Sequence, residues 1–156
     1  MWSTLIGKIL TTLVIAMVPV IELRGAIPIA IANGLSFPAA LIISFIGNII
    51  PVPFIIIFIR KIFSWLRNLS PKLNTLVTKL EERAEKKSDV VLKYAFWGLF
   101  ILVAIPLPGT GAWTGALVAA MLNMRLKSAF PAIALGVAGA GALVTFITYG
   151  ADKLFF

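Results

Sequence analysis

Long apolar stretches without a charged residue make up most of this chain, and proline and glycine interrupt them. One such stretch covers the 35 residues from Gly25 to Ile59. As a single helix it would be about 50 Å long, whereas the hydrocarbon core of a bilayer is about 30 Å thick. It is broken at Pro28, at Asn33-Gly34 and at Pro51 and Pro53. The stretch therefore predicts several membrane-embedded helices rather than one straight span.

The composition places the whole chain, residues 1–156, in one membrane domain. Its residues are 60% hydrophobic and 13% charged, and the mean hydropathy is +1.04, which is too apolar for a water-soluble domain of this size. Cysteine and histidine are absent, which excludes thiol catalysis, disulfides, the usual zinc sites and imidazole proton transfer. We expect no metal, no cofactor and no enzymatic activity, since the membrane segments hold no paired catalytic carboxylates.

The basic residues are concentrated in one loop. The net charge is +8, and nine of the fourteen Lys and Arg residues lie between residues 60 and 93, flanked by apolar sequence. A nucleic-acid-binding protein needs a folded basic face but not this much apolar sequence, so we exclude nucleic acid as a partner. Clusters of this kind instead orient membrane proteins.

Three apolar segments are only half as long as a membrane is thick. They contain 11 or 12 residues each, roughly 17 to 18 Å as helices: Leu23–Asn33, Tyr94–Ile105 and Ala112–Asn123. Paired around a turn at mid-depth, such segments form re-entrant hairpins, which are tolerated where the freed backbone is buried in protein or lines a wet cavity. The alternative is that the broken segments cross fully. Residues 5–21 are long enough to cross alone, and residues 9–21 also have the length of a signal-peptide core.

A weak internal repeat relates the two halves. Aligning RGAIPIAIAN (24–33) with TGALVAAMLN (114–123) matches four of ten positions, and Phe-Pro-Ala recurs at 37–39 and 130–132. Each unit would be a hairpin followed by a full span, at Phe37–Ile59 and Ser128–Gly150. We therefore predict an all-α integral membrane fold with two inverted repeats, residues 1–59 and 94–156.

Charge placement predicts the orientation. Eleven basic residues, nine in the 60–93 loop together with Arg125 and Lys127, oppose Lys8 and Lys153 if the broken segments are hairpins. The loop is then cytoplasmic and both termini lie outside. Full crossing gives the same ratio of eleven to two, so charge does not separate the two models.

The connector, residues 60–93, has an amphipathic pattern. Its first part suits a helix lying at the lipid headgroups, with Ile62, Phe63, Trp65, Leu66 and Leu69 beside basic residues. Ser70-Pro71 is typical of a helix start, and apolar residues then recur at helical spacing. We interpret this part as a solvated connector helix, with regulatory or anionic-lipid binding as the alternative.

Glu22 and Arg24 are the ionisable residues that lie within apolar membrane sequence away from loops and termini. Such residues cost about 2.5 to 3.5 kcal/mol each at mid-helix and by default indicate function. Glu22 is our candidate for proton coupling, because burial favours the neutral form of a carboxyl group. Arg24 stays charged and would bind a carboxylate or phosphate. The alternative is that the two residues lie near an interface and only pair with each other.

The segment PLPGTGAWTG (106–115) predicts a second polar site. A helix beginning near Ala112 directs unsatisfied N–H groups into the turn, which favours an anion. The candidate substrate-binding residues here are Gly109, Thr110, Gly111, Trp113, Thr114 and Gly115. The hairpins would break at Gly25 and Pro28 in the first half and at Pro106 and Pro108 in the second. Gly111 and Gly115 also fit a helix-packing face.

Other small and polar residues have structural interpretations. Gly136, Gly139 and Gly141 predict close helix packing, within the chain or across a dimer. Asn48 is expected to hydrogen-bond within the bundle. Because so small a bundle encloses little space alone, we expect a homodimer.

ELRGAIP (22–28) and PLPGTGAWTGALVAA (106–120) resemble the small multidrug export protein family of bacteria and archaea. That family resembles a distant branch of the DedA/VTT superfamily, whose members are linked to lipid or polyprenyl-phosphate translocation and proton-dependent drug tolerance. Glu22 matches the superfamily's acidic residue in the first hairpin, and Pro108-Gly109 its break in the second. Thr110, Ala112 and Trp113 stand where superfamily relatives have arginines.

Together these features predict a transporter or translocase in the plasma membrane of a prokaryote. Its partners would be the bilayer and an anionic or amphipathic small molecule or lipid headgroup. The alternative is a membrane scaffold or assembly protein that transports nothing, in which the polar residues only orient the hairpins.

Overall fold

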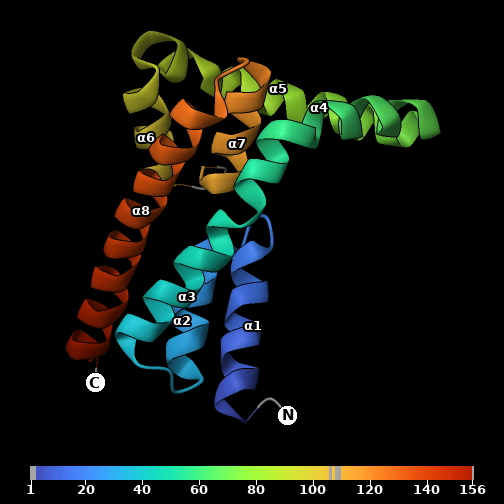
Figure 1. The fold of residues 1–156 in the computed structure, drawn as a ribbon. Helices are drawn as coiled ribbons and strands as arrows, with labels where there is room; N and C mark the ends of the chain where they lie inside the picture. Colours follow the sequence, from blue (N-terminus) through green and yellow to red (C-terminus); the bar gives the residue numbers. More distant parts are fainter. Residues whose placement is uncertain (1–2, 106, 108–109, 156) are drawn as a thin grey trace.

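The computed structural model describes the backbone of residues 3–105, 107 and 110–155, and the side chains of these residues except 88–92, 152, 154 and 155. The described part of the chain contains helices and no strands, which confirms the all-α prediction. The helices are α1 (Leu5–Met17), α2 (Glu22–Ala32), α3 (Phe37–Ile49), α4 (Pro51–Leu69), α5 (Pro71–Tyr94), α6 (Phe96–Ala104), α7 (Ala112–Met121) and α8 (Leu126–Phe155). The N- and C-termini lie at the same end of the molecule (Figure 1).

Helices α1 and α2 form a hairpin whose connection lies midway along the molecule (Figure 1). The chain leaves α1 in an extended conformation at Val18 and turns at Val20, which has a φ of 82°. The prediction that this hairpin breaks at Gly25 and Pro28 is therefore wrong, because both residues lie inside α2. Pro28 removes one backbone hydrogen bond from a helix that is packed on other helices, and such a loss is tolerated inside a protein.

Helices α3 and α4 continue one another with a bend at Ile50-Pro51. Pro51 occupies the first position of α4, where a missing N–H costs nothing. Among the described residues, two helical segments are long and apolar enough to cross a membrane, Phe37–Leu69 and Leu126–Ala151, and each contains an 18-residue window whose mean hydropathy is 2.5 and 2.0, respectively. The two predicted spans fall within these segments; the first begins at Phe37 as predicted but continues beyond Ile59, and the second extends beyond Ser128–Gly150 at both ends.

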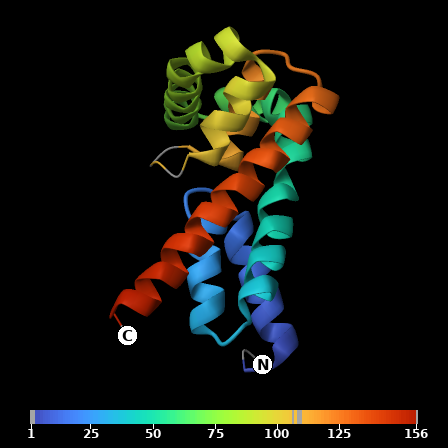
Figure 2. The same ribbon diagram turned by 90° about the vertical axis from the view of Figure 1, so that its left-hand side faces the viewer.

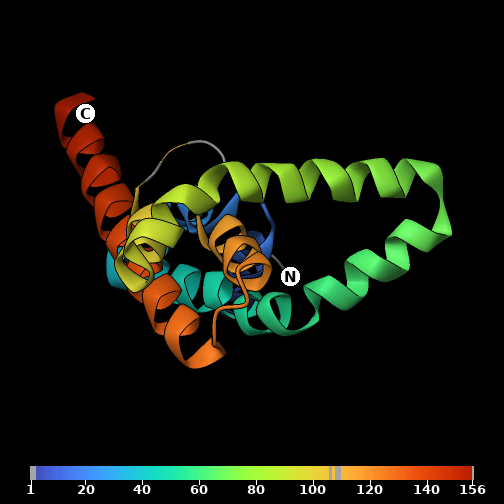
Figure 3. The same cartoon turned by 90° about the horizontal axis from the view of Figure 1, so that it is seen from above.

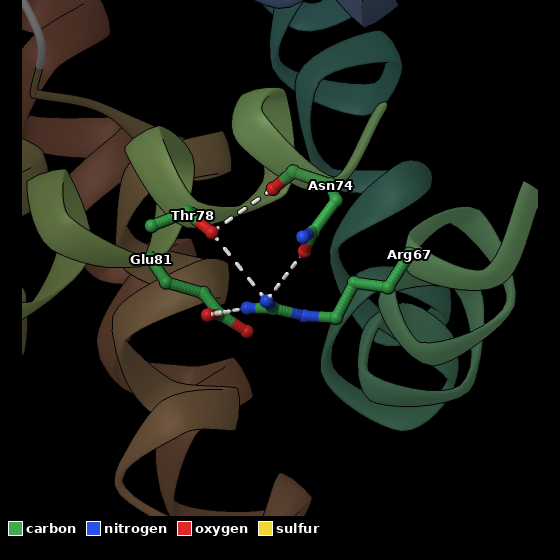
Figure 4. Close-up of polar contacts among 4 residues, drawn as sticks. All are labelled: Arg67, Asn74, Thr78 and Glu81. Carbon is green, nitrogen blue, oxygen red and sulfur yellow. Dashed lines mark hydrogen bonds and ion pairs between the residues drawn. The ribbon is translucent and has the colours of Figure 1, made fainter. Parts of the chain in front are cut away.

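The predicted headgroup helix of residues 60–69 is the end of α4 rather than a separate element. Together with α5 it forms an arm that projects from the bundle (Figures 1 and 3). Ser70 accepts a hydrogen bond from the Leu73 N–H, as a helix cap does. Arg67 joins the two helices by an ion pair with Glu81 and hydrogen bonds to Asn74 (3.0 Å) and Thr78 (3.4 Å) (Figure 4).

Helices α6 and α7 form the second hairpin. Its open end lies at the end of the molecule opposite the termini (Figure 1). The chain turns at Ala95, with a φ of 49°, so α6 begins at Phe96 and Tyr94 ends α5. The C-terminal end of α6 and the N-terminal end of α7 face the α1–α2 connection across the middle of the molecule (Figures 1 and 2). The two hairpins therefore meet tip to tip.

Helix α8 runs along both hairpins and packs on them through small residues (Figure 2). A Cβ atom on Gly136 would lie 2.7 Å from Val103 Cβ in α6, and one on Gly141 would lie 2.9 Å from Leu41 Cδ1 in α3. The predicted close packing therefore occurs within the chain. Large apolar side chains also face outward, including Phe146 at 77% and Ile6 at 70% exposure, as expected for helices that contact lipid.

Candidate functional site

Glu22 lies at the tip of the first hairpin and is 4% exposed. It is the first residue of α2, with a φ of 50°. Its Oε1 accepts a hydrogen bond of 3.1 Å from the backbone N–H of Trp113, in the first turn of α7. The N-terminal end of a helix carries unsatisfied N–H groups and a partial positive charge, so it stabilises a carboxylate. The anion site that we predicted at this helix end is thus occupied by the chain's own acid.

Arg24 contacts the other arm of the second hairpin. Its Nη1 donates to the Leu107 carbonyl (2.7 Å), and its Nη2 donates to the Ile105 carbonyl (3.1 Å) and to Thr110 Oγ1 (3.0 Å). A longer contact of 3.5 Å reaches the Val103 carbonyl, in the last turn of α6. Carbonyls at a helix C-terminus lack partners and carry partial negative charge, which a guanidinium group offsets.

The two charges on α2 therefore match the two helix ends of the second hairpin. The acid lies at the N-terminus of α7 and the guanidinium at the C-terminus of α6. The alternative that Glu22 and Arg24 only pair with each other is not what the structure has. Among the described residues, the recorded ion pair joins Arg67 and Glu81.

Thr110 and Gly111 shape the turn that receives these side chains. Thr110 Oγ1 lies 2.7 Å from the Ile105 carbonyl and 2.6 Å from the Leu107 carbonyl, so it donates its one hydrogen within the turn. Gly111 has φ and ψ of 129° and −170°, a region that is essentially restricted to glycine. A Cβ atom there would overlap the Glu22 carboxylate. Gly111 thus permits the close approach of the acid.

The other predicted binding residues have different surroundings. The Trp113 indole N–H donates to the Met17 carbonyl (3.0 Å) and so ties α7 to the end of α1. Thr114 is half-buried and has a polar partner. A Cβ atom on Gly115 would meet Val103 and Ile133, so this glycine permits packing against α6 and α8. Pro106, Pro108 and Gly109 lie outside the described residues.

A family model described as "Putative small multi-drug export protein" matches residues 22–143, more than three quarters of the chain. The chain belongs to this family. The matched part begins at Glu22 and contains every contact between α2 and the second hairpin, and the family description indicates an exporter rather than an enzyme. No curated protein and no solved structure is significantly similar to the chain.

A small void lies beside the two charged residues of this small multi-drug export family member. It has no room for a water molecule and is bordered by α2, α3, α6, α7 and α8. Asn48 of α3 lines it together with Glu22 and Arg24. This asparagine is 3% exposed, and its Oδ1 has no hydrogen-bond partner.

Asn48 is the site residue that our sequence reasoning missed, because we expected it to be satisfied within the bundle. The available signal was a side-chain amide in a stretch that is otherwise almost wholly apolar. Nothing in the sequence indicated that α3 lies beside the tip of α2, so the amide of Asn48 could not be assigned to the same site as Glu22 and Arg24.

A second hollow, of about 390 Å³, lies under the arm and is lined by Arg60, Phe63, Ser64, Arg67, Glu81 and Met121. Its two guanidinium groups already have partners, since Arg60 donates to the Met121 carbonyl (3.0 Å) and Arg67 pairs with Glu81. We assign these contacts to holding the arm against α7. Within the described part of the chain, no three acidic, Cys or His side chains gather as a metal site requires.

Proposed function

We propose that this chain is a secondary transporter that moves a small amphipathic molecule or an anionic headgroup across the membrane, coupled to a proton carried by Glu22. The observation that supports the proposal is a buried acid, Glu22, beside a half-buried guanidinium group, Arg24, where two hairpin tips meet. Placing charges in apolar surroundings is costly and is retained mainly where they act.

The contacts of Glu22 suggest how proton binding and substrate binding are coupled. While Glu22 is charged, it occupies the N-terminus of α7 through the Trp113 N–H. A proton from the bulk solution neutralises the carboxylate and weakens this charge-assisted bond. The helix end and Arg24 then attract the negative group of a substrate. When Glu22 releases the proton, it competes for the same N–H groups and displaces the substrate.

We further propose that the two hairpins are re-entrant and belong to inverted repeats. The α1–α2 connection and the facing ends of α6 and α7 lie midway along the molecule (Figure 1), and α2 and α7 have 11 and 10 residues. Gly25 and Gly115, which the repeat aligns, both occupy the fourth position of their helix. In this arrangement the 60–93 connector is cytoplasmic and the termini lie outside, in the plasma membrane of a prokaryote. The relationship to the DedA/VTT superfamily stays a prediction.

Reconstitution of the purified chain in liposomes tests the function. Pyranine inside the vesicles reports proton movement when an amphipathic anionic dye is added outside, and fluorescent phosphatidylglycerol reports lipid translocation. We expect saturable transport of one of these two compounds, accompanied by proton movement across the membrane. If neither compound crosses the membrane or moves protons, the transport proposal fails for both substrate classes.

One observation favours the alternative of a membrane scaffold. In the described structure, Glu22 and both terminal nitrogens of Arg24 bond to the second hairpin, as purely structural groups would. A scaffold predicts no saturable flux in the unsubstituted chain, whereas both proposals predict a loss of stability when Arg24 is replaced. The homodimer that we expect belongs to both proposals and is tested by native mass spectrometry.

A further inference from the structure

Asn48 has an unmet hydrogen-bonding requirement in the interior. Its Oδ1 is a buried acceptor without a partner, and a buried acceptor in that state costs free energy. Because the void beside it is too narrow for water, a bridging water does not satisfy it. The residues that line the void with Asn48 are the candidates for its partner.

Those residues offer few donors. Arg24 directs its Nη1 and Nη2 groups at carbonyls 103, 105 and 107 and at Thr110. Among the described residues, Glu22 and Arg24 are the charged groups that line the void. Helices α6, α7 and α8 contribute only apolar side chains, and the turn contributes Gly111. A further side-chain donor arises when Glu22 binds a proton, since a neutral carboxyl group has an O–H.

We propose that Asn48 Oδ1 accepts the hydrogen bond of the protonated Glu22 carboxyl, so that α2 and α3 together form a proton-holding site. Charged Glu22 takes the Trp113 N–H, and neutral Glu22 gives its O–H to Asn48. The inference rests on the proposed function of Glu22 as proton carrier. It adds a positioning residue on a different helix, whose role is to stabilise the carrier in its loaded state.

Infrared difference spectroscopy of the full chain in liposomes, recorded between low and high pH, tests this site. The C=O stretch of neutral Glu22 is identified as the band that Glu22→Gln removes. A carboxyl group that donates a hydrogen bond absorbs at lower wavenumber than a free one, so Asn48→Leu should shift the band upward. Asn48→Thr keeps an oxygen acceptor and should leave the band nearer its original position.

Ser44→Ala provides the matched control. Ser44 lies one turn earlier on α3, is fully buried, and also has an unpartnered oxygen, but it does not line the void. This control should leave the band in place. At a pH where Glu22 is charged and Oδ1 has no partner, Asn48→Leu should also keep the melting temperature of the protein. A large loss of thermal stability would assign Asn48 a structural role and overturn the inference.

The outcomes separate the two proposals. If the band is present and Asn48→Leu does not move it, Asn48 is not the acceptor, and Glu22 remains a proton carrier. If no band is lost in Glu22→Gln, Glu22 does not bind a proton and both proposals fail.

Discussion

Glu22 and Trp113 lie 91 residues apart in the sequence, and a hydrogen bond from the Trp113 N–H to Glu22 Oε1 joins them. Two residues further along α2, Arg24 reaches 83 residues forward to the Leu107 carbonyl. Helix α2 thus supplies a charge of the opposite sign to each helix end at the tip of the second hairpin. Its acid meets the N-terminus of α7, and its guanidinium group meets the C-terminus of α6.

Glu22→Gln should abolish pH-driven flux while the protein still folds. The amide oxygen of glutamine can accept the Trp113 N–H but cannot carry a proton at physiological pH. Flux is measured in liposomes, and folding by SDS titration in mixed micelles. Glu22→Ala removes the acceptor as well and should lower the free energy of unfolding by about 1 to 3 kcal/mol. Flux that persists in Glu22→Gln would remove Glu22 from the mechanism.

Arg24→Leu should destabilise the fold by about 1.5 to 3 kcal/mol, since charge-assisted bonds to the α6 end are lost. Arg24→Lys keeps the charge but not the forked geometry and should lose less. Arg67→Leu is the control, because its ion pair is partly exposed and is worth about 0 to 1 kcal/mol. Equal losses in Arg24→Leu and Arg67→Leu would contradict the role assigned to Arg24.

Gly111→Ala should destabilise the protein by about 1 to 3 kcal/mol through backbone strain, and by more if the Glu22 carboxylate is displaced. Gly150→Ala is the matched control, because nothing lies within 4 Å of its Cβ position in α8. That substitution should be neutral or stabilise the helix by up to about 1 kcal/mol. Unfolding in SDS compares the two variants, and similar behaviour would show that the Gly111 conformation is not required.

Gly136→Ala should destabilise the contact between α6 and α8 by about 1 to 3 kcal/mol, because the added atom would lie 2.7 Å from Val103 Cβ and 3.0 Å from the Phe100 carbonyl. In Gly139→Ala the nearest atom, Ala104 Cβ, would be 3.5 Å away, an ordinary contact. In detergent, Gly136→Ala should therefore have a clearly lower melting temperature than Gly139→Ala. The reverse order would refute this packing assignment.

Single cysteines at Ser36 and Ser128 test the hairpin topology, since the chain has no cysteine of its own. Both positions are exposed; Ser36 caps the start of α3 and Ser128 lies in the first turn of α8, and the starts of these two helices lie at opposite ends of the molecule (Figure 1). A membrane-impermeant thiol reagent should label Ser36→Cys from outside and Ser128→Cys only after the vesicles are opened. Labelling of both from the same side would exclude the re-entrant model.

The order of elements was largely predictable. Charge-free lengths, the Ser70-Pro71 cap and the start of α7 at Ala112 are local properties, since each depends on neighbours within a few residues. The first hairpin break was not predictable from Pro28, because a single missing hydrogen bond does not end a helix that its neighbours support. The chain turns instead at Val20, whose positive φ has no local signature in the sequence.

The sequence by itself therefore determined that this chain belongs in a membrane, where its helices lie, and that Glu22 and Arg24 are its costly residues. Only the tertiary structure decided what those residues touch. Glu22 has its partner 91 residues away, Arg24 bonds mainly to backbone carbonyls, and Asn48 joins them from a third helix. The physical reason is that backbone groups at helix ends are the same for every residue type, so their role as binding partners depends on spatial arrangement alone.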